Sequence, residues 1–257
     1  MLGGAPQLYI PVVQNPEFDK VDLSGIKLAV SGAAPLPMPI LDKMLKIFSG
    51  VVSEGYGLTE ITMGCCLNPP MRDSIRPGSV GIPFPDTYVK VIGLDTGEIL
   101  SPGEEGEICI IGPQCMQGYW NKPEETAQVL IDGWVHSGDI GYEDKDGYLY
   151  ITDRKKDMII YKGYNVYPRQ LEEVLYEHPA VASCAVLGKK DEKGGEIPVA
   201  FIQRKPNIDP SPDEILGFVN SRVAHYKHIR EVRFIDAIPV SAAGKVLKRE
   251  LKNLLQE

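Results

Sequence analysis

No long hydrophobic run occurs in this chain, and its start carries no leader-like charge. Across 257 residues no stretch reaches the roughly 18 to 20 uncharged apolar residues that a membrane-spanning helix needs. Residues 1–4 contain none of the basic side chains of a signal-peptide n-region. We therefore expect a soluble, cytoplasmic protein without a transmembrane segment, and 43% hydrophobic residues allow a substantial core.

The chain also lacks the cysteine spacing of a zinc site or a disulfide framework. Its five cysteines form no C-x-x-C pair and lie far from the four histidines in the sequence. We expect them to be free and mostly buried thiols, as isolated cysteines usually are. They are Cys65, Cys66, Cys109, Cys115 and Cys184.

Positive charge is scarce in the first part of the chain. Residues 1–152 carry 9 Lys or Arg and 20 Asp or Glu, a net charge of −11, whereas residues 153–257 carry 18 and 15, a net charge of +3. Two solvated surfaces can differ in this way without any function. Alternatively, the second part brings cations to an anionic ligand held against the first. Composition alone favours the first interpretation, and no nucleic-acid partner is expected.

What is present begins with alternating strand and helix patterns. Residues 26–32 (IKLAVSG) are apolar at nearly every position, which is typical of a buried parallel strand. A helix is predicted over residues 36–48 and a short strand over 51–53, followed by the glycine-bracketed stretch 54–60. Open α/β sheets place ligands at the carboxyl ends of such strands.

Proline, glycine and short alternating strands mark the middle of the chain. Strands are predicted over residues 88–92 and 106–111, and one helix over residues 124–130. This pattern indicates a small β-barrel or sheet. Residues 157–257 indicate a compact α+β unit, with helices over 169–176 and 212–223, strands over 181–187, 197–203 and 232–235, and a last helix whose leucines 247, 251, 254 and 255 point inward. Ser211 is the expected N-cap of the second helix.

The charged cluster at residues 153–157 lies between two strand-like runs, YLYIT and MIIY. Five residues without Gly or Asn at the centre make a poor tight hairpin, so a hinge between two folding units is the better interpretation. The predicted fold is a multidomain α/β and α+β protein. Its parts are an α/β remnant over 1–67, a β-rich subdomain over 68–152, the hinge, and a small α+β domain over 158–257.

Four polar or glycine-rich spots could carry chemistry. They are residues 31–35 after a buried strand, residues 56–60, the Asp of Ser137-Gly138-Asp139, and the Lys of Gly244-Lys245. Residues 31–35 could admit a flat ligand, and residues 56–60 could hold Mg²⁺ and phosphate. Asp139 could accept the hydroxyls of a ribose, and Lys245 could meet a transferring phosphoryl group. Each alone is more simply explained as an ordinary turn, capped loop or surface lysine.

Together and in this order, the motifs resemble the adenylate-forming acyl-CoA synthetases, a family that includes luciferases and peptide-synthetase adenylation domains. The resemblance covers essentially the entire chain. The matching segments are SGAAPLP (31–37), GYGLTE (55–60), GEICIIGPQCMQGYWN (106–121), GWVHSGDIG (133–141), DRKKDMIIYKGYNVYPRQLEEVL (153–175) and PVSAAGKVLKREL (239–251).

The resemblance implies an AMP-forming ligase that uses ATP, Mg²⁺ and coenzyme A. It implies nucleotide contacts from the early glycine-rich stretches, phosphate contact by Thr59, Mg²⁺ binding by Glu60 and ribose binding by Asp139. Arg154 would add ribose or phosphate contacts, Lys156 would be the hinge residue, Lys245 would stabilise the adenylation transition state, and Gly163 would line the path of CoA. The early nucleotide contacts are Gly32, Ala33, Ala34, Tyr56 and Gly57.

One family element is missing from the 257 residues: the Ser/Thr/Gly-rich phosphate loop that ends in Pro-Lys-Gly. The expectation is therefore a truncated fatty-acyl-CoA ligase, active only poorly by itself, with apolar surface exposed on residues 1–60 and self-association as a result. Peripheral membrane contact and a homo-oligomer also fit. The alternatives are a non-catalytic AMP-, acyl-adenylate- or partner-binding module, and an enzyme for an aryl acid or a carrier-protein acceptor; Ile160 argues against light emission.

Overall fold

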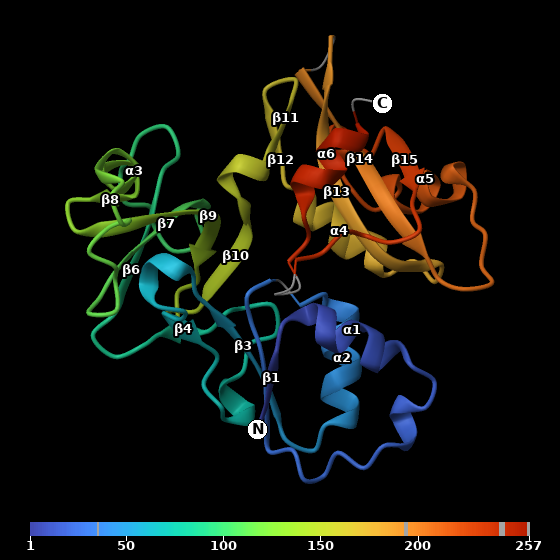
Figure 1. Ribbon diagram of the computed structural model, residues 1–257, viewed down its shortest axis with the longest axis horizontal. Coiled ribbons are helices and arrows are strands. Elements are labelled where there is room, and N and C mark those ends of the chain that lie inside the picture. The colour runs from blue at the N-terminus through green and yellow to red at the C-terminus, as the bar shows by residue number, and fades with distance from the viewer. Residues whose placement is uncertain (35, 193–194, 242–244, 256–257) are drawn as a thin grey trace. The chain divides into compact units, whose positions relative to one another are not determined.

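The computed structural model describes residues 1–34, 36–192, 195–241 and 245–255 (Figure 1). Pro35 of the first predicted motif and residues 242–244 of the last lie outside the described residues. The chain forms two compact units, Met1–Lys155 and Lys156–Glu257. Among the described residues, no helix is both long and apolar enough to cross a membrane.

A mixed sheet with two helices opens the first unit. β1 (Leu2–Gly4), β2 (Leu28–Ser31) and β3 (Val51–Tyr56) run parallel, and β4 (Cys66–Leu67) and β5 (Ile82–Pro83) continue the sheet antiparallel in the order β1-β2-β3-β4-β5. α1 (Pro6–Gln14) and α2 (Met38–Ile47) share one apolar core with β2 and β3. The short 3-10 helices η1 (Phe18–Lys20), η2 (Thr59–Ile61) and η3 (Arg72–Ser74) lie in the connections.

The second sheet of this unit is antiparallel and β-rich, as the alternating pattern predicted. Its strands are β6 (Tyr88–Ile92), β7 (Gly106–Ile111), β8 (Leu130–Ile131), β9 (Trp134–Glu143) and β10 (Leu149–Arg154). They lie in the order β10-β9-β7-β6, with β8 paired to β9, and α3 (Pro123–Val129) precedes β8. One core joins this sheet to the first, because Ile108 and Ile110 of β7 cluster with Ile61 and Cys66. The turn after β3 is therefore fixed against β7.

The second unit is an α+β fold around a central strand, β14 (Gly195–Arg204). β13 (Val181–Asp191) and β11 (Ile159–Tyr161) pair with it antiparallel, β15 (Glu231–Phe234) pairs parallel, and β12 (Tyr164–Val166) pairs with β11. The helices are α4 (Pro168–Tyr176), α5 (Pro212–Asn220) and α6 (Lys248–Leu254), with the 3-10 helix η5 (His225–Lys227). The 3-10 helix η4 (Lys155–Asp157) begins at the last residue of the first unit. Buried apolar residues of α4, α5, β13 and β14 form its main core.

The strand-like runs on either side of the charged cluster do not pair with each other. β10 belongs to the second sheet of the first unit, and β11 belongs to the sheet of the second unit. The expectation that these runs form no hairpin is confirmed. The assignment of residues 1–152, 153–157 and 158–257 as separately acting parts remains a prediction.

Several local predictions are confirmed and others need correction. Strands β6 and β7 have the predicted bounds, and the Ser211 hydroxyl caps α5 by accepting from the Glu214 N–H at 3.2 Å. The last helix does not bury all four of its leucines, since Leu254 is 37% exposed while Leu251 is fully buried. A single row of leucines at 3-4 spacing shows which positions lie close on a helix, but not where the helix leaves the core.

Candidate nucleotide site

Asp139 collects hydrogen bonds from two other predicted site residues. The Tyr56 hydroxyl, at the end of β3, donates to Oδ2 at 2.6 Å, and the Arg154 Nε, at the end of β10, donates to Oδ1 at 2.8 Å. Arg154 is also the register partner of Asp139 across β9 and β10. Asp139 is buried. The pKa of Tyr56 lies well above its usual value, first because the phenol is desolvated and second because the negative charge of Asp139 is close. The structure therefore brings these three residues together.

The backbone around Asp139 is held by groups that sequence reasoning missed. Gly138 has a φ of 69°, and its N–H donates to Oε1 of Glu107 at 3.2 Å. The Ser137 hydroxyl donates to the Ile108 carbonyl at 2.7 Å and accepts the Asp139 N–H at 3.0 Å. Glu107 had a signal in the sequence, because it is a charged residue in an otherwise apolar strand.

Glu60 and Thr59 lie on η2, directly after the glycine-bracketed turn. Oε1 of Glu60 accepts a hydrogen bond from the Tyr119 hydroxyl at 2.5 Å, which raises the pKa of Tyr119 to about 12. The Glu60 carbonyl accepts the Met116 N–H at 2.8 Å, so the loop after β7 is bonded to both the backbone and the side chain of Glu60. Thr59 is exposed. Tyr119, absent from the predicted site, is the side chain that orients the candidate metal ligand.

Close backbone approach requires a glycine at position 57 and leaves little room for a side chain at position 32. A Cβ at Gly57 would lie 1.4 Å from the Met63 carbonyl oxygen, and a Cβ at Gly32 would lie 3.3 Å from that of Gly55. Ser31, the last residue of β2, is the register partner of Glu54 in β3. Gly32 therefore lies beside the end of β3 that carries Tyr56. Ala33 follows Gly32 with a φ of 68°, a left-handed backbone conformation. The predicted nucleotide stretches 32–34 and 56–57 therefore lie at neighbouring strand ends.

One feature at these strand ends fits a polar ligand. The Ser31 hydroxyl oxygen is buried without a hydrogen-bond partner among the described residues. An unpaired buried hydroxyl is costly, so a ligand that reaches it would relieve a real penalty. Among the described residues no group of three or more His, Cys, Asp or Glu side chains could hold a metal by itself. One carboxylate such as Glu60 is nevertheless sufficient for Mg²⁺ that arrives with a nucleotide, because Mg²⁺ commonly uses one or two carboxylates plus substrate phosphates.

Three predicted site residues belong to the second unit. Lys245 is exposed, and its backbone is bonded both ways to Ser241, through the Ser241 hydroxyl at 3.1 Å and the Ser241 N–H at 2.8 Å. Gly163 has a φ of 82° in the turn between β11 and β12, and a Cβ there would meet nothing within 4 Å. Glycine is thus needed at position 163 for its backbone, not for space. Lys156 lies on η4 and lines a small cavity together with Lys248.

Comparison with known proteins gives the family. The model of the AMP-binding enzymes matches residues 1–120, and the model of the AMP-binding enzyme C-terminal domain matches residues 170–245. The chain belongs to the AMP-binding enzyme family. The resemblance to adenylate-forming synthetases is thereby confirmed.

Curated relatives of this AMP-binding protein are CoA ligases. A long-chain-fatty-acid–CoA ligase of Bacillus subtilis is 45% identical, and 4-coumarate–CoA ligase 2 of Oryza sativa subsp. japonica is 41% identical. In both comparisons the alignment takes in 96% of this chain and 44% of the relative. The chain therefore spans less than half the length of these relatives.

Solved structures of the family have the same fold. ATP-bound MatB from Rhodopseudomonas palustris superposes with a TM-score of 0.91 at 31% identity, over 100% of this chain and 51% of that one. The anthranilate CoA ligase AuaEII in complex with anthranoyl-AMP gives a TM-score of 0.90 at 30% identity, over 98% and 49%. The predicted mixed α/β and α+β fold class is confirmed.

Proposed function

We propose that the protein acts as an ATP-dependent, AMP-forming acid–CoA ligase. The observation that carries the proposal is the cluster of Tyr56, Asp139 and Arg154, in which strands distant in the sequence bring a buried carboxylate, a phenol and a guanidinium together. A carboxylate flanked by an aromatic ring and a cation suits a ribose next to a base and a phosphate. Relatives named as CoA ligases support the same reaction.

The proposed reaction has two steps. First, an oxygen of the acid attacks the α-phosphorus of ATP, the bond to the bridging oxygen of the β-phosphate breaks, and pyrophosphate leaves. Second, the CoA thiolate attacks the acyl carbon, the bond to AMP breaks, and AMP leaves with the electron pair while the thiol proton passes to solvent. Both steps join charged groups, so positioning and charge stabilisation are the protein's main contributions.

In this proposal each predicted residue has one role in the first step. Gly32, Ala33, Ala34 and Gly57 let backbone approach the adenine beside Tyr56, Asp139 accepts the ribose hydroxyls and Arg154 adds a cation. Thr59 contacts the phosphate, Lys245 stabilises charge between the carboxylate and the α-phosphate, and Glu60 would hold Mg²⁺. When bound, Mg²⁺ neutralises phosphate charge.

The second step uses the other predicted residues of the second unit. Gly163 lines the path of CoA, and Lys156 is the hinge residue that lets the small domain present Lys245 and then Gly163. The break between compact units after Lys155 supports a hinge at this position. The domain roles themselves are part of the proposal.

We propose a fatty acid as the substrate, because a fatty-acid ligase is among the relatives with the highest identity. We propose that residues 61–64 and 78–81 border the acyl pocket, because their mostly small or apolar side chains leave room for a long chain. Position 64 faces an apolar group, since a Cβ built on Gly64 would lie 3.1 Å from the Phe84 ring. An aryl acid is the second candidate, since 4-coumarate and feruloyl ligases are 41% and 39% identical. The cytoplasmic location and any contact with a membrane surface stay predictions.

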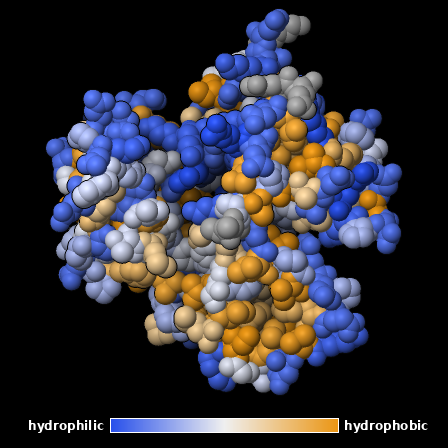
Figure 2. Space-filling view, in the orientation of Figure 1, coloured by the Kyte–Doolittle hydropathy of each residue, from blue (hydrophilic) through white to orange (hydrophobic). Residues whose placement is uncertain are grey.

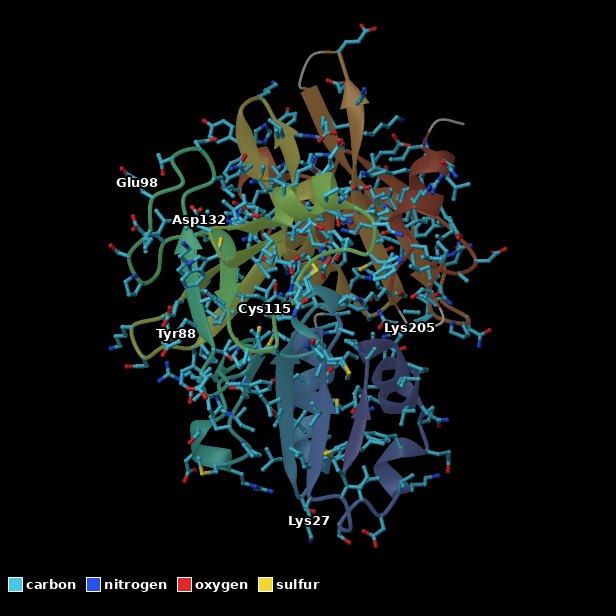
Figure 3. The ribbon with its side chains drawn as sticks, turned by 60° about the vertical axis from the view of Figure 1, so that its left-hand side comes forward. Lys27, Tyr88, Glu98, Cys115, Asp132 and Lys205 are labelled. Atoms are coloured by element: carbon cyan, nitrogen blue, oxygen red, sulfur yellow. The ribbon has the colours of Figure 1, made fainter. Side chains whose placement is uncertain are left out.

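Binding measurements on this chain test the proposal directly. We expect isothermal titration calorimetry to detect binding of AMP. The substitution Asp139→Asn should weaken this binding by roughly 10- to 100-fold, the usual effect of removing a charged hydrogen-bond acceptor. Glu98→Asn is the matched control, because Glu98 is an exposed acidic residue elsewhere on the β-rich part (Figure 3). Equal affinity of Asp139→Asn and the unchanged chain would contradict the ribose role.

Activity measurements then separate an enzyme from a binding module. Because the 257 residues lack the phosphate loop, we expect little acid-dependent ATP–pyrophosphate exchange from this chain alone. Adding the N-terminal part of a related ligase in trans should produce acyl-CoA, with Lys245→Ala inactive. AMP binding without any acyl-CoA under these conditions would favour the non-catalytic alternative.

A further inference from the structure

Glu107 is a buried acid at the second position of strand β7. Its side chain is 10% exposed, although its neighbours in the strand are apolar. Oε1 accepts the Gly138 N–H at 3.2 Å, Oε2 accepts the Lys155 Nζ at 3.0 Å, and Nδ1 of His136 lies 3.8 Å from Oε2. A buried carboxylate destabilises a fold unless it is paired in this way.

The partner of Glu107 is the last residue of the first unit. Lys155 ends that unit, and Arg154 before it is bonded to Asp139. Two successive cations of the charged cluster are therefore tied to two buried carboxylates of the same unit. Beyond the boundary, Asp157 lies 3.8 Å from Lys248 of the second unit. Side-chain anchors thus flank Lys156 on both sides.

We propose that Glu107 is a positioning residue that anchors the N-terminal side of the hinge through Lys155. The same carboxylate fixes the turn before Asp139 through the Gly138 N–H, so the hinge and the ribose acceptor are held by one side chain. The pivot is confined to the backbone around Lys156. The inference rests on the proposed function for the meaning of the hinge and of Asp139, whereas the anchor itself is measurable without any ligand.

Proteolysis of the full chain tests the anchor. Glu107→Gln keeps the size of the side chain and an oxygen for Gly138, but it removes the charge that holds Lys155. We expect trypsin to cleave after Lys155 roughly two- to fivefold faster, as befits loss of a half-exposed ion pair. Cleavage sites are identified by mass spectrometry, and rates are normalised to the exposed Lys27 (Figure 3).

A control variant and the salt dependence distinguish loss of the Glu107–Lys155 ion pair from a general loosening of the fold. Glu105→Gln removes an acid two residues away, whose carboxylate accepts the Thr152 hydroxyl at 2.9 Å, and should leave cleavage after Lys155 unchanged. Raising NaCl from about 50 mM to about 500 mM should speed cleavage of the unchanged chain but hardly affect Glu107→Gln, because salt screens the partly exposed pair. Equal acceleration by both substitutions would overturn the proposal.

Hydrogen exchange gives a second test that does not need Lys155 as a cleavage site. Glu107→Gln and Lys155→Gln should each increase exchange over residues 153–158, and the double variant should exchange no faster than the faster single variant. Additive increases, or no increase in either single variant, would refute the pairing. The Lys155→Gln variant keeps the pairing testable if Glu107→Gln does not fold, because Lys155 is half-exposed and a chain with glutamine at this position should still fold. Failure of AMP to bind would reject the proposed function and leave these results standing.

Discussion

The hydroxyl of Tyr119 lies 2.5 Å from Oε1 of Glu60, across 59 positions of sequence. Tyr119 is itself anchored, since its N–H donates to the hydroxyl of Thr126, in the middle of α3, at 2.9 Å. The bond holds one carboxylate oxygen of Glu60 and leaves Oε2 for a cation. Residues that orient a metal ligand commonly affect metal affinity nearly as much as the ligand itself.

Tyr119→Phe should therefore weaken divalent-metal binding by about tenfold without unfolding the chain. The measurement is titration with Mn²⁺, as a paramagnetic substitute for Mg²⁺, in the presence of AMP and pyrophosphate, followed by electron paramagnetic resonance. Tyr88→Phe is the control, because Tyr88 is exposed on the outer side of the β-rich part (Figure 3). An unchanged Mn²⁺ affinity would show that Glu60 needs no help from Tyr119.

His178 predicts an acid-sensitive second unit. Burial, helped by Arg222 and Lys205 and opposed by Glu214, lowers its folded pKa from the usual 6.5. The unfolded chain therefore binds more protons near that pH, so the contribution of His178 is complete above 6.5 and is lost as pH falls toward the folded pKa. The Nδ1 atom, which accepts the Ala180 N–H at 3.2 Å, must stay unprotonated to do so.

The corresponding measurement is the melting temperature of the chain between about pH 5 and pH 8. We expect the melting temperature to fall below about pH 6.5, and His178→Asn, which keeps an acceptor, to flatten that part of the curve. His225→Asn serves as control, because His225 lies on the surface of the same unit. The same acid slope in His178→Asn and in the unchanged chain would assign the effect to other groups.

Core substitutions test whether the two units unfold independently. Leu171→Ala removes a fully buried side chain from the core of the second unit and should destabilise that unit by about 2–5 kcal/mol. Leu149→Ala is the matched change in the first unit. If the units are independent, calorimetry should show two transitions, of which each variant lowers only one, by about 10 °C or more. A single transition lowered equally by both would contradict separate domains.

Exposed apolar side chains on the first helices predict self-association. Leu8 and Val12 lie four residues apart on α1 and are 63% and 52% exposed, and Figure 2 shows apolar residues gathered over α1 and α2. We expect the chain to form concentration-dependent oligomers, and Leu8→Glu with Val12→Glu to shift it toward the monomer. Sedimentation velocity measures the change.

A distant apolar residue supplies the control for self-association. Ile99→Glu changes an equally exposed side chain in the β-rich part and should leave the oligomers intact. A monomer at all concentrations before any substitution would rule out this surface as a contact.

Local patterns in the sequence predicted much of this fold, and the features that they missed have a physical reason. Short apolar runs between turn-forming Gly, Pro and Asp residues gave the bounds of β6 and β7, although β7 is buried on both faces and not at alternate residues. The motifs brought Tyr56, Asp139 and Arg154 into one site. Glu107 stood out as a charged residue in an apolar strand, but its role and that of Tyr119 escaped prediction because they come from contacts with residues 31 to 59 positions away, which no local period encodes.

The paired state of Asp139 determines how a ligand can reach it. Both carboxylate oxygens already accept hydrogen bonds, one from the partly buried Tyr56 and one from Arg154, whose side chain is 50% exposed. Each carboxylate oxygen can accept a second hydrogen bond, so an arriving diol could share Asp139 with both side chains or exchange places with Arg154, which can move into water more easily than Tyr56 can. The Asp139–Arg154 pair is electrically neutral, and if Arg154 turned to the phosphate, the hydroxyls of the diol would remain as hydrogen-bond donors to the Asp139 carboxylate. Selectivity for a nucleotide over a nucleoside would follow from that exchange, because only a nucleotide offers the displaced guanidinium a new anion.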